Sequence, residues 1–313
     1  MSVYNSPHYL KEAIESVLNQ TSSTFEFLII NNGSTDNSTD ILKEYSLRDE
    51  RIRVLNHEHA DLGDALNFGL KSAKHEWVFR MDADDLMYPT RLEKQLSFIA
   101  QHPELKVTAC RGIYIDRQGN EAGVTGLDVL TPQDCKHYVE QCEAIGFLHP
   151  GVALHRQTAL DLGGYRSQFY PAEDIDLWNR IAEQGHLVFG QDAVLMHYRL
   201  HASSDIARNY FGMRDKFDWV RDCMRRRRNS QKELDWTEFQ EFLKTQPLLK
   251  RLNRRRKSTA KFFFRQAGLN FVHSNQMQAG LKLCAAAALQ PDYVLQRLWG
   301  LAQSRRHKTM SSQ

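Results

Sequence analysis

Apolar residues in the first 200 positions of the chain alternate between helical and strand spacing. Ser6-Pro7 is typical of a helix start, and Leu10, Ile14 and Val17 then recur every three or four residues, which predicts a helix ending near position 20. Strand patterns cover residues 25–30, 52–55, 77–81, 107–115 (one strand or a bent pair), 149–155, 187–189 and 194–198. Further helical patterns carry Ile41, Leu42 and Tyr45, then Leu62, Leu66 and Leu70, then residues 90–101, then Leu177, Trp178 and Ile181. This alternation predicts an α/β fold with a parallel sheet.

Polar turns follow two of the predicted strands. One turn is Asn31–Asp36, after the strand 25–30, and the other is Asp82–Asp85, after the strand 77–81. In parallel α/β sheets, ligands bind beyond the carboxyl ends of the strands. Both turns are therefore candidates for a binding site.

The second turn has the residue types of a metal site. Side chains alternate along a strand, so Asp82 and Asp84 point the same way if the extended backbone continues through them. Two carboxylates on one side suit a hard cation such as Mg²⁺ or Mn²⁺, with positions left for phosphate oxygens. The alternative is a solvated acidic turn ahead of Pro89, since short motifs often arise without function.

Charge divides the chain into two regions, although its net charge is only +3. From Lys216 onward there are 21 Lys/Arg and 7 Asp/Glu, a net of +14, whereas the first 215 residues carry −11. This asymmetry suggests that the two regions have different partners. The five cysteines are scattered and never spaced as C-x-x-C, which argues against a disulfide framework or a zinc site and suits a reducing compartment. No signal peptide and no apolar run near 18 residues is visible, so a soluble or peripheral protein is expected.

Five separate stretches form a recognisable set of motifs: Val3–Ser6 with Val17–Thr21, Ile29–Ser38, Arg80–Asp85 with Pro89, Arg91-Leu92 and Gln95, Ala172–Trp178, and Tyr198–His201. Together they resemble the family 2 glycosyltransferases of bacterial surface-polysaccharide synthesis. Their order and spacing match over roughly residues 1–205. The resemblance implies the GT-A fold, a Rossmann-like, mostly parallel sheet flanked by helices. It places a catalytic domain at 1–205 and leaves a basic helical C-terminal region at 206–313.

The resemblance also implies an activity and a set of site residues. A sugar would pass from a nucleotide-diphosphate-sugar donor to an acceptor hydroxyl of a glycan or lipid-linked glycan, with inversion. Mn²⁺ or Mg²⁺ would be held by Asp84, Asp82 and His201, and Asp174 would be the general base. The residues implied to contact the donor are Tyr4, Asn5, Asn32, Asp61, Arg80, Asp82 and Ala83.

Two of these assignments have equally plain structural alternatives. His201 could be a surface histidine on a loop. Asp174 could be one of three acidic residues, with Glu173 and Asp176, that the helix dipole favours in a first turn.

The chain departs from the family pattern at three places. A buried apolar strand normally precedes the Val-Tyr-Asn stretch, whereas this sequence starts at Met1-Ser2-Val3, so we expect either a late start or a loss of central core. Asn31-Asn32 replaces a pair of aspartates, and an amide cannot supply carboxylate charge. His59-Ala60-Asp61 replaces the usual Asn-x-Gly. The last two changes leave the identity of the donor open.

The basic C-terminal region is helical over residues 261–272 and 277–289, and it lies outside the catalytic resemblance. A small helical appendage, covering the sheet or joining a homodimer, is one interpretation. Basic residues interleaved with Phe262–Phe264 and Trp299 also suit an anionic membrane surface, which would place a cytoplasmic enzyme at the inner face of the cell membrane. No nucleic-acid partner is expected, because no binding motif accompanies the arginines.

The residues and the resemblance together leave three functions from different classes. The first is an inverting, metal-dependent glycosyltransferase that transfers a hexose or N-acetylhexosamine. The second is a catalytically silent sugar-nucleotide-binding or scaffolding protein of the same fold. The third is a nucleotidyltransferase, which would require a glycine-rich basic loop after the first strand, and the sequence contains none there.

Overall fold

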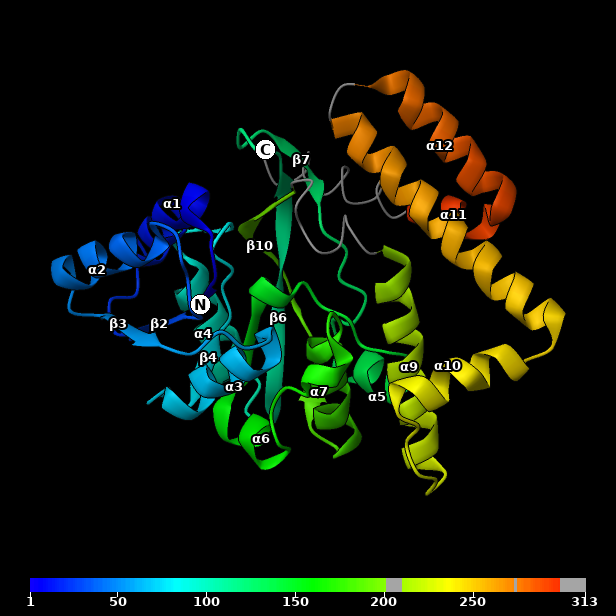
Figure 1. The fold of residues 1–313 in the computed structure, drawn as a ribbon, viewed down its shortest axis with the longest axis horizontal. Coiled ribbons are helices and arrows are strands. Elements are labelled where there is room, and N and C mark those ends of the chain that lie inside the picture. The colour runs from blue at the N-terminus through cyan, green and yellow to red at the C-terminus, as the bar shows by residue number, and fades with distance from the viewer. Residues whose placement is uncertain (201–209, 273–274, 299–313) are drawn as a thin grey trace. The chain divides into compact units, whose positions relative to one another are not determined.

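The computed structural model describes residues 1–200, 210–272 and 275–298 (Figure 1). Contacts between Cα atoms divide the chain into one unit over Met1–Glu233 and a second over Leu234–Gln313. Helix α9 (Tyr210–Arg228) falls within the first unit, where Trp219 stacks on Phe169. The first unit thus includes α9 as well as the stretch that carries the family resemblance.

The first unit begins with a small parallel sheet. Its order is β1 (Ser2–Val3), β2 (Phe27–Asn31) and β3 (Ile52–Asn56). Helices α1 (Pro7–Leu18) and α2 (Ser38–Arg48) pack against it, and a buried apolar cluster fills the contact. The strand that the sequence suggested to be missing is thus represented by two residues that pair in parallel with β2.

A larger mixed sheet forms the centre of the first unit. Its order is β4 (Trp77–Phe79), β8 (Val152–His155), β6 (Leu105–Ile115), β10 (Gln191–Arg199) and β5 (Leu86–Met87), and β7 (Glu121–Val124) and β9 (Leu187–Val188) also pair with β6. Strand β6 is parallel to β9 and β10 and antiparallel to β7 and β8. Its eleven residues form one strand rather than a bent pair. The architecture is α/β, as predicted.

The remaining helices of this unit cover the sheets. They are α3 (Leu62–Ser72), α4 (Arg91–Gln101), α5 (Pro132–Glu140), α6 (Arg156–Asp161) and α7 (Glu173–Glu183), with short 3₁₀ turns at His149–Gly151 and Ser167–Phe169. The sequence pattern missed β5, β7, α5 and α6. All four are short, and only α5 has a strong local signal, the capping box of Thr131 and Asp134.

Strand β4 ends earlier than its apolar pattern suggested, at Phe79 rather than Met81. Residues Asp82–Asp85 therefore lie in a turn, where the alternation of a strand does not hold. The burial still alternates, because Ala83 and Asp85 are buried while Asp82 and Asp84 are half-buried. The two predicted metal ligands thus share the more accessible side of the turn.

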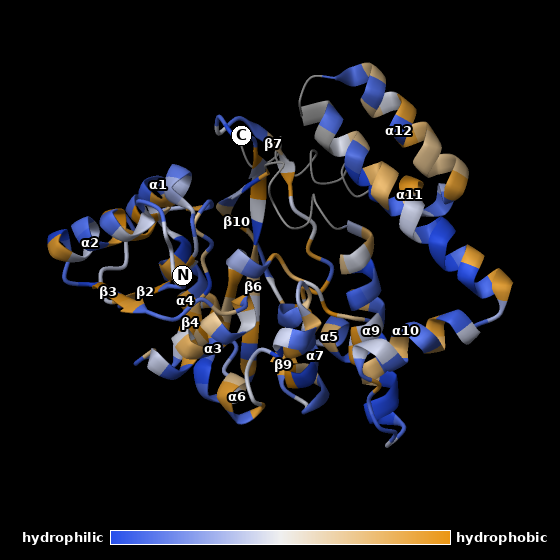
Figure 2. Cartoon of the chain, in the orientation of Figure 1, coloured by the Kyte–Doolittle hydropathy of each residue, from blue (hydrophilic) through white to orange (hydrophobic). Residues whose placement is uncertain are grey.

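The second unit is helical. It contains α10 (Trp236–Thr245), α11 (Leu248–Val272) and α12 (Gln276–Leu289), and α11 and α12 lie side by side as an antiparallel pair (Figure 1). Arg256 of α11 donates to the carbonyl oxygen of Leu289 at 2.8 Å. Figure 2 shows apolar and polar residues interleaved along both helices. Among the described residues, no helix is both long enough and apolar enough to span a bilayer.

Candidate functional site

The loops after β1, β2 and β3 meet at one edge of the small sheet, because parallel strands end there together. The Asn5 Oδ1 accepts from the Thr35 N–H at 2.9 Å, and the Asn5 N–H donates to the Ser34 hydroxyl at 3.2 Å. The ring of Tyr4 stacks on His59, with centroids 4.2 Å apart. The structure therefore brings together the loops that carry Tyr4, Asn5 and the β2 turn.

The side chain of Asn32 joins two of these loops. Its Oδ1 accepts from the Ala60 N–H at 3.1 Å, while its Nδ2 donates to the Ala60 carbonyl at 2.8 Å. The residue is buried, and an aspartate could accept but not donate. The amide therefore ties the β2 turn to the loop that leads to Asp61, through a pair of bonds that a carboxylate could not make. Asp61 itself caps α3, accepting from the Asp64 N–H at 3.1 Å.

Arg80 connects β4 to the carboxylate turn. Its guanidinium is buried and donates to the Asp82 carboxylate at 2.5 Å and to the Met81 carbonyl. Burial raises the pKa of Asp82, and so does the charge of Asp84, although Arg80 opposes the change. Burial followed by repulsion from Asp84 and Asp82 raises the pKa of Asp85 well above its usual range. Neighbouring carboxyl groups of the turn thus raise the pKa of both Asp82 and Asp85, and Arg80 opposes this change in both.

Arg199, at the end of β10, holds this turn in place. Its backbone N–H donates to the Asp85 Oδ1 at 2.8 Å, and its Nε donates to the Asp84 carbonyl at 2.9 Å. A further bond reaches Glu12 of α1 at 2.9 Å. The sequence indicated Arg199 only as part of a motif, because partners more than 100 residues away leave no local signal.

These residues fit a divalent cation, although the described part of the chain contains no group of three or more His, Cys, Asp or Glu arranged as a metal site. Mg²⁺ is commonly bound through one or two carboxylates plus substrate phosphates, so Asp82 and Asp84 would suffice. The Oδ2 of Asp85 is buried and has no hydrogen-bond partner within the described residues. A third carboxyl oxygen of the same turn is therefore unpaired there. His201, the third expected ligand, lies outside the described residues.

The amino end of α7 carries the predicted base. Asp174 is buried, and its Oδ1 accepts from the Ile175 N–H at 2.7 Å. Burial, followed by the charge of neighbouring Glu173, raises the pKa of Asp174 well above its usual range, and Arg80 acts in the opposite direction. A carboxyl with a raised pKa is a stronger base when it is ionised, which suits proton abstraction.

Tyr165 is buried, and half-buried His149 lies next to it. The His149 Nε2 lies 3.2 Å from the Tyr165 hydroxyl. Burial lowers the pKa of His149 well below its usual range, with Arg80 as a second cause, so the imidazole is neutral. Burial raises the pKa of Tyr165, and both Asp174 and Asp82 raise it further. Asp174 of α7 and Asp82 of the β4 turn therefore both raise the pKa of the same hydroxyl group, that of Tyr165. The only sequence signal for Tyr165 was its position after Gly163-Gly164.

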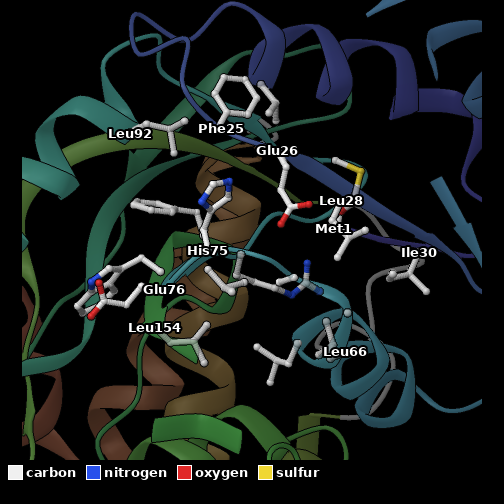
Figure 3. A pocket seen from close by; sticks show the side chains of 18 of the residues that line it. Met1, Phe25, Glu26, Leu28, Ile30, Leu66, His75, Glu76, Leu92 and Leu154 are labelled. Carbon is white, nitrogen blue, oxygen red and sulfur yellow. Dashed lines mark hydrogen bonds between the residues drawn. The ribbon is translucent and has the colours of Figure 1, made fainter. Parts of the chain in front are cut away.

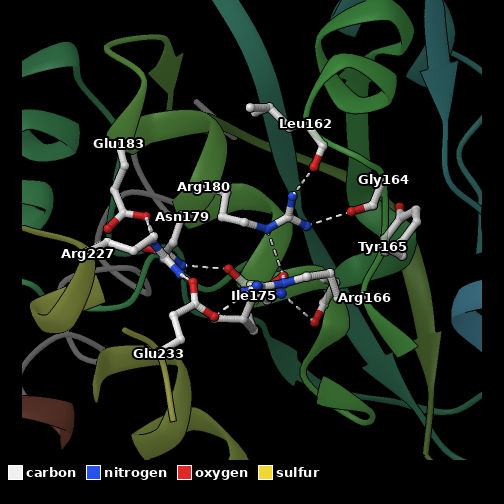
Figure 4. Close-up of polar contacts among 12 residues, drawn as sticks. Leu162, Gly164, Tyr165, Arg166, Ile175, Asn179, Arg180, Glu183, Arg227 and Glu233 are labelled. Carbon is white, nitrogen blue, oxygen red and sulfur yellow. Dashed lines mark hydrogen bonds and ion pairs between the residues drawn. The ribbon is translucent and has the colours of Figure 1, made fainter. Parts of the chain in front are cut away.

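Asp176, by contrast, pairs with Arg166 and Arg180, two members of the network of polar contacts that Figure 4 shows. It is fully buried and accepts from the Arg180 Nε at 2.9 Å and from the Arg166 Nε at 2.9 Å. Arg166 also reaches Glu233, which pairs with Arg227 of α9. This network fixes α7 against its neighbours and leaves Asp176 no open side for a substrate. Of the three acidic residues in the first turn, Asp176 is therefore structural.

The sequence model of Glycosyl transferase family 2 matches residues 1–162, half of the chain. A putative glycosyltransferase, EpsE of Bacillus subtilis, is 32% identical over 209 residues, covering 66% of this chain and 72% of that protein. The chain belongs to glycosyl transferase family 2. The amylovoran biosynthesis glycosyltransferase AmsE of Erwinia amylovora is 32% identical to this glycosyltransferase over 212 residues, covering 66% of this chain and 76% of AmsE.

Solved structures of glycosyltransferases share the fold. TarS 1-349 of S. aureus, in complex with UDP-GlcNAc, aligns with a TM-score of 0.56 at 16% identity, covering 93% of this chain and 90% of that one. The mannosyltransferase PcManGT of Pyrobaculum calidifontis, in complex with GDP-Man and Mn²⁺, aligns with a TM-score of 0.53 at 17% identity, covering 99% and 81%. Family membership favours glycosyl transfer over the nucleotidyl transfer considered from the sequence.

Proposed function

We propose that this chain is an inverting glycosyltransferase that uses a nucleotide-diphosphate-sugar donor to build a surface polysaccharide or a lipid-linked glycan. The observation that carries the proposal is the separation of roles at the start of α7. Asp176 is held in ion pairs with Arg166 and Arg180, whereas Asp174 is a buried carboxylate whose pKa is raised by burial and by Glu173. The biosynthetic setting is supported by relatives such as AmsE and the O-antigen biosynthesis glycosyltransferase WbnJ.

The donor would bind at the loops that follow β1 to β4. Tyr4 and Asn5 lie at the rim, and Asn32 keeps the β3–α3 loop with Asp61 beside them. Arg80 and Ala83 belong to the β4 turn, close to the predicted diphosphate position. The solved complexes of TarS with UDP-GlcNAc and of PcManGT with GDP-Man support a sugar nucleotide of this class.

Asp82 and Asp84 would hold Mn²⁺ or Mg²⁺, with His201 as the further expected ligand. When bound, the ion supplies Lewis-acid neutralisation of the charge on the leaving diphosphate. Asp174 would accept the proton of the acceptor hydroxyl while the hydroxyl oxygen forms a new bond to the anomeric carbon of the donor sugar. The bond from that carbon to the diphosphate oxygen breaks in the same step, so a single displacement inverts the configuration.

The proposal is tested by incubating the purified chain with a panel of UDP-, GDP- and dTDP-sugars and measuring the nucleoside diphosphate released. We expect release from one or a few donors, stimulated by a membrane extract that contains lipid-linked acceptors. Donor binding by calorimetry without any release would instead support the silent sugar-nucleotide-binding protein.

The second unit would place the enzyme at an anionic membrane surface. It carries 14 Lys/Arg against 4 Asp/Glu over residues 234–313. At the start of α11, Leu248, Leu249 and Leu252 are exposed beside Lys250 and Arg251. An amphipathic basic helix of this kind is typical of binding at the lipid headgroups, and each Lys/Arg near the surface contributes about 1 kcal/mol. The same leucines could join two copies of the chain, so a homodimer is the alternative.

Replacing Leu248, Leu249 and Leu252 with serine is expected to weaken sedimentation with vesicles of anionic lipid at least roughly 10-fold, because apolar contact with the acyl boundary is lost. The wild-type chain should bind at low salt and dissociate at high salt. Leu47→Ser is the matched control, since Leu47 is 80% exposed on α2, in the acidic first unit. Undiminished binding by the triple variant would remove α11 from the interaction, and a change in molecular mass instead would assign the leucines to a dimer.

A further inference from the structure

Two tyrosines lie side by side on one face of the larger sheet. Strands β6 and β10 run parallel, and their register places Tyr114 opposite Tyr198. The two rings meet edge to face, with centroids 5.9 Å apart and planes at 75°, a geometry typical of aromatic pairs. Both residues are half-buried, so each keeps part of its surface exposed. We call these two residues the tyrosine pair.

The register of the sheet puts the tyrosine pair beside the carboxylate turn. Strand β5 is antiparallel to β10, and Leu86 lies opposite His197. One step further along, Asp85 comes opposite Tyr198, and residues opposite each other in an antiparallel pair share a face. The Arg199 N–H donates to the Asp85 Oδ1 at 2.8 Å and holds the two segments together at this point. Burial, followed by the charges of the turn's carboxyl groups, raises the pKa of the Tyr198 hydroxyl well above its usual range.

The inner part of the same face is covered by Leu148. Gly112 and Met196 precede the two tyrosines by two residues on their strands, so they lie on the same face. A Cβ added at Gly112 would come within 3.1 Å of the Met196 Cγ and 3.2 Å of the Leu148 Cδ2. The tyrosine pair is therefore the outer end of a packed face, next to the ends of both strands.

On its other side the tyrosine pair meets a glycine. Strand β7 is antiparallel to β6, and Gly123 lies opposite Tyr114. A Cβ added at Gly123 would meet no atom of the described residues within 4 Å. Glycine inside a strand marks a bulge or a place where a ligand approaches closely. Across the strands, the face thus runs from a carboxyl group through two aromatic rings to a position without a side chain.

The tyrosine pair is separate from the cavity of about 370 Å³ that Figure 3 shows. That cavity is lined mostly by apolar residues such as Leu28, Leu66 and Leu154, and the two tyrosines are not among its lining residues. A sugar buried there would lose the hydrogen bonds that its hydroxyl groups make to water, which costs free energy. A half-exposed pair of tyrosines imposes no such loss.

We propose that the tyrosine pair binds the sugar ring of the acceptor, so that the acceptor is a glycan recognised through its terminal ring. This inference rests on the proposed function. A sugar ring has an apolar face of C–H groups and a rim of hydroxyl groups, and tyrosine offers an apolar ring with a polar end. The expected donor loops follow β1, β2 and β3 of the small sheet, whereas the tyrosines belong to the larger one, which assigns them to the second substrate. A ring stacked there stands beside the turn expected to hold the diphosphate, as transfer between the two requires.

The test measures the KM for octyl glycosides of glucose, galactose and N-acetylglucosamine, used as acceptor probes with the full chain at saturating donor. Tyr198→Leu and Tyr114→Leu keep an apolar side chain and remove the ring. Each should raise the acceptor KM roughly tenfold and leave donor affinity and kcat near wild type, because an aromatic contact to the bound ring is lost. Tyr198→Phe keeps the ring and should stay within about threefold of wild type.

Tyr88→Leu is the matched control. Tyr88 contacts His197, the neighbour of Tyr198 whose side chain points to the opposite face of the sheet, so its loss should leave the acceptor KM unchanged. An unchanged acceptor KM in both leucine variants of the tyrosine pair would overturn the proposal. A loss of donor affinity in its place would also overturn it, and would assign the rings to the donor sugar. Transfer by the wild type to the membrane extract but to none of the glycosides would overturn it as well.

A second measurement does not depend on transfer. If the wild type releases nucleoside diphosphate from no donor, the proposed function fails, but sugar binding by the tyrosine pair can still be measured. The chain is labelled with fluorotyrosine, and the fluorine resonances of Tyr114 and Tyr198 are assigned from their phenylalanine variants. Titration with the methyl glycosides of the same three sugars should shift both resonances and leave that of Tyr88 in place. Resonances that do not move would overturn the proposal.

Discussion

Asp174→Asn is expected to lower kcat for sugar transfer roughly 10²-fold or more while leaving donor affinity near the wild-type value. The reason is that positioned proton transfer contributes about 10²- to 10⁴-fold, and an amide cannot accept the proton of the acceptor hydroxyl. Steady-state transfer kinetics together with calorimetry of donor binding separate the two effects. Normal transfer by this variant would contradict the assignment and leave Glu173 as the candidate base.

The raised pKa of Asp174 adds a second readout to the same variant. Lowering the pH protonates the carboxyl and removes the base, so kcat/KM should fall on an acid limb well above the usual pKa of an aspartate. The same shift means that stability decreases as pH rises through the folded-state pKa, because the folded state then loses a proton from a buried site. Asp174→Asn removes that cost, so the variant should be at least as stable as wild type at neutral pH.

Asp176→Asn is the matched comparison, two residues further along the same helical turn. It leaves Arg166 and Arg180 without their shared carboxylate, and breaking a buried pair costs about 3–5 kcal/mol of unfolding free energy. We therefore expect a large loss of stability with kcat per folded molecule retained. The two aspartates thus separate a loss of chemistry from a loss of fold.

Asp84→Ala is expected to reduce transfer by roughly 10²- to 10³-fold, and removal of divalent metal with EDTA should reduce wild-type transfer to a similar degree. A metal Lewis acid supplies several kcal/mol of leaving-group stabilisation, and each 1.36 kcal/mol is about tenfold in rate. The measurement is transfer with and without EDTA, followed by restoration with Mn²⁺ or Mg²⁺.

The control for this prediction is Asp192→Ala, which removes an exposed carboxylate paired with Arg111. Exposed ion pairs contribute about 0–1 kcal/mol, so transfer should stay within about twofold of wild type. Full activity of Asp84→Ala in the presence of EDTA would exclude the metal role of the β4 turn.

The sequence predicted those helices and strands that bury one face, because their apolar residues recur at a regular spacing. Leu10, Ile14 and Val17 identified α1, and the alternation of strands and helices identified the α/β class. The end of β4 was placed too late, because Met81 is apolar and buried without being in a strand, and so lengthens the apolar pattern past Phe79. An apolar residue in the sequence indicates burial rather than strand structure. The pattern alone therefore cannot show where a strand ends and a buried turn begins.

The sequence predicted the site only in part, because the roles of several residues depend on contacts that form when the chain folds. Asp82, Asp84 and Asp174 lie in short motifs and could be named from the sequence. The roles of Asn32 and Arg199 depend on partners distant in sequence, Ala60 for Asn32 and Asp85 for Arg199. Burial then determines how each carboxyl titrates, and burial is a property of the folded chain.

The proposed mechanism is a single displacement at the anomeric carbon, with Asp174 taking the proton of the acceptor. Its decisive readout is the anomeric configuration of the first product, followed by proton NMR during transfer from a donor of known configuration. We expect a product of the opposite configuration, so that an α-linked donor gives a β-linked glycan. A product that retains the donor's configuration would contradict the single displacement.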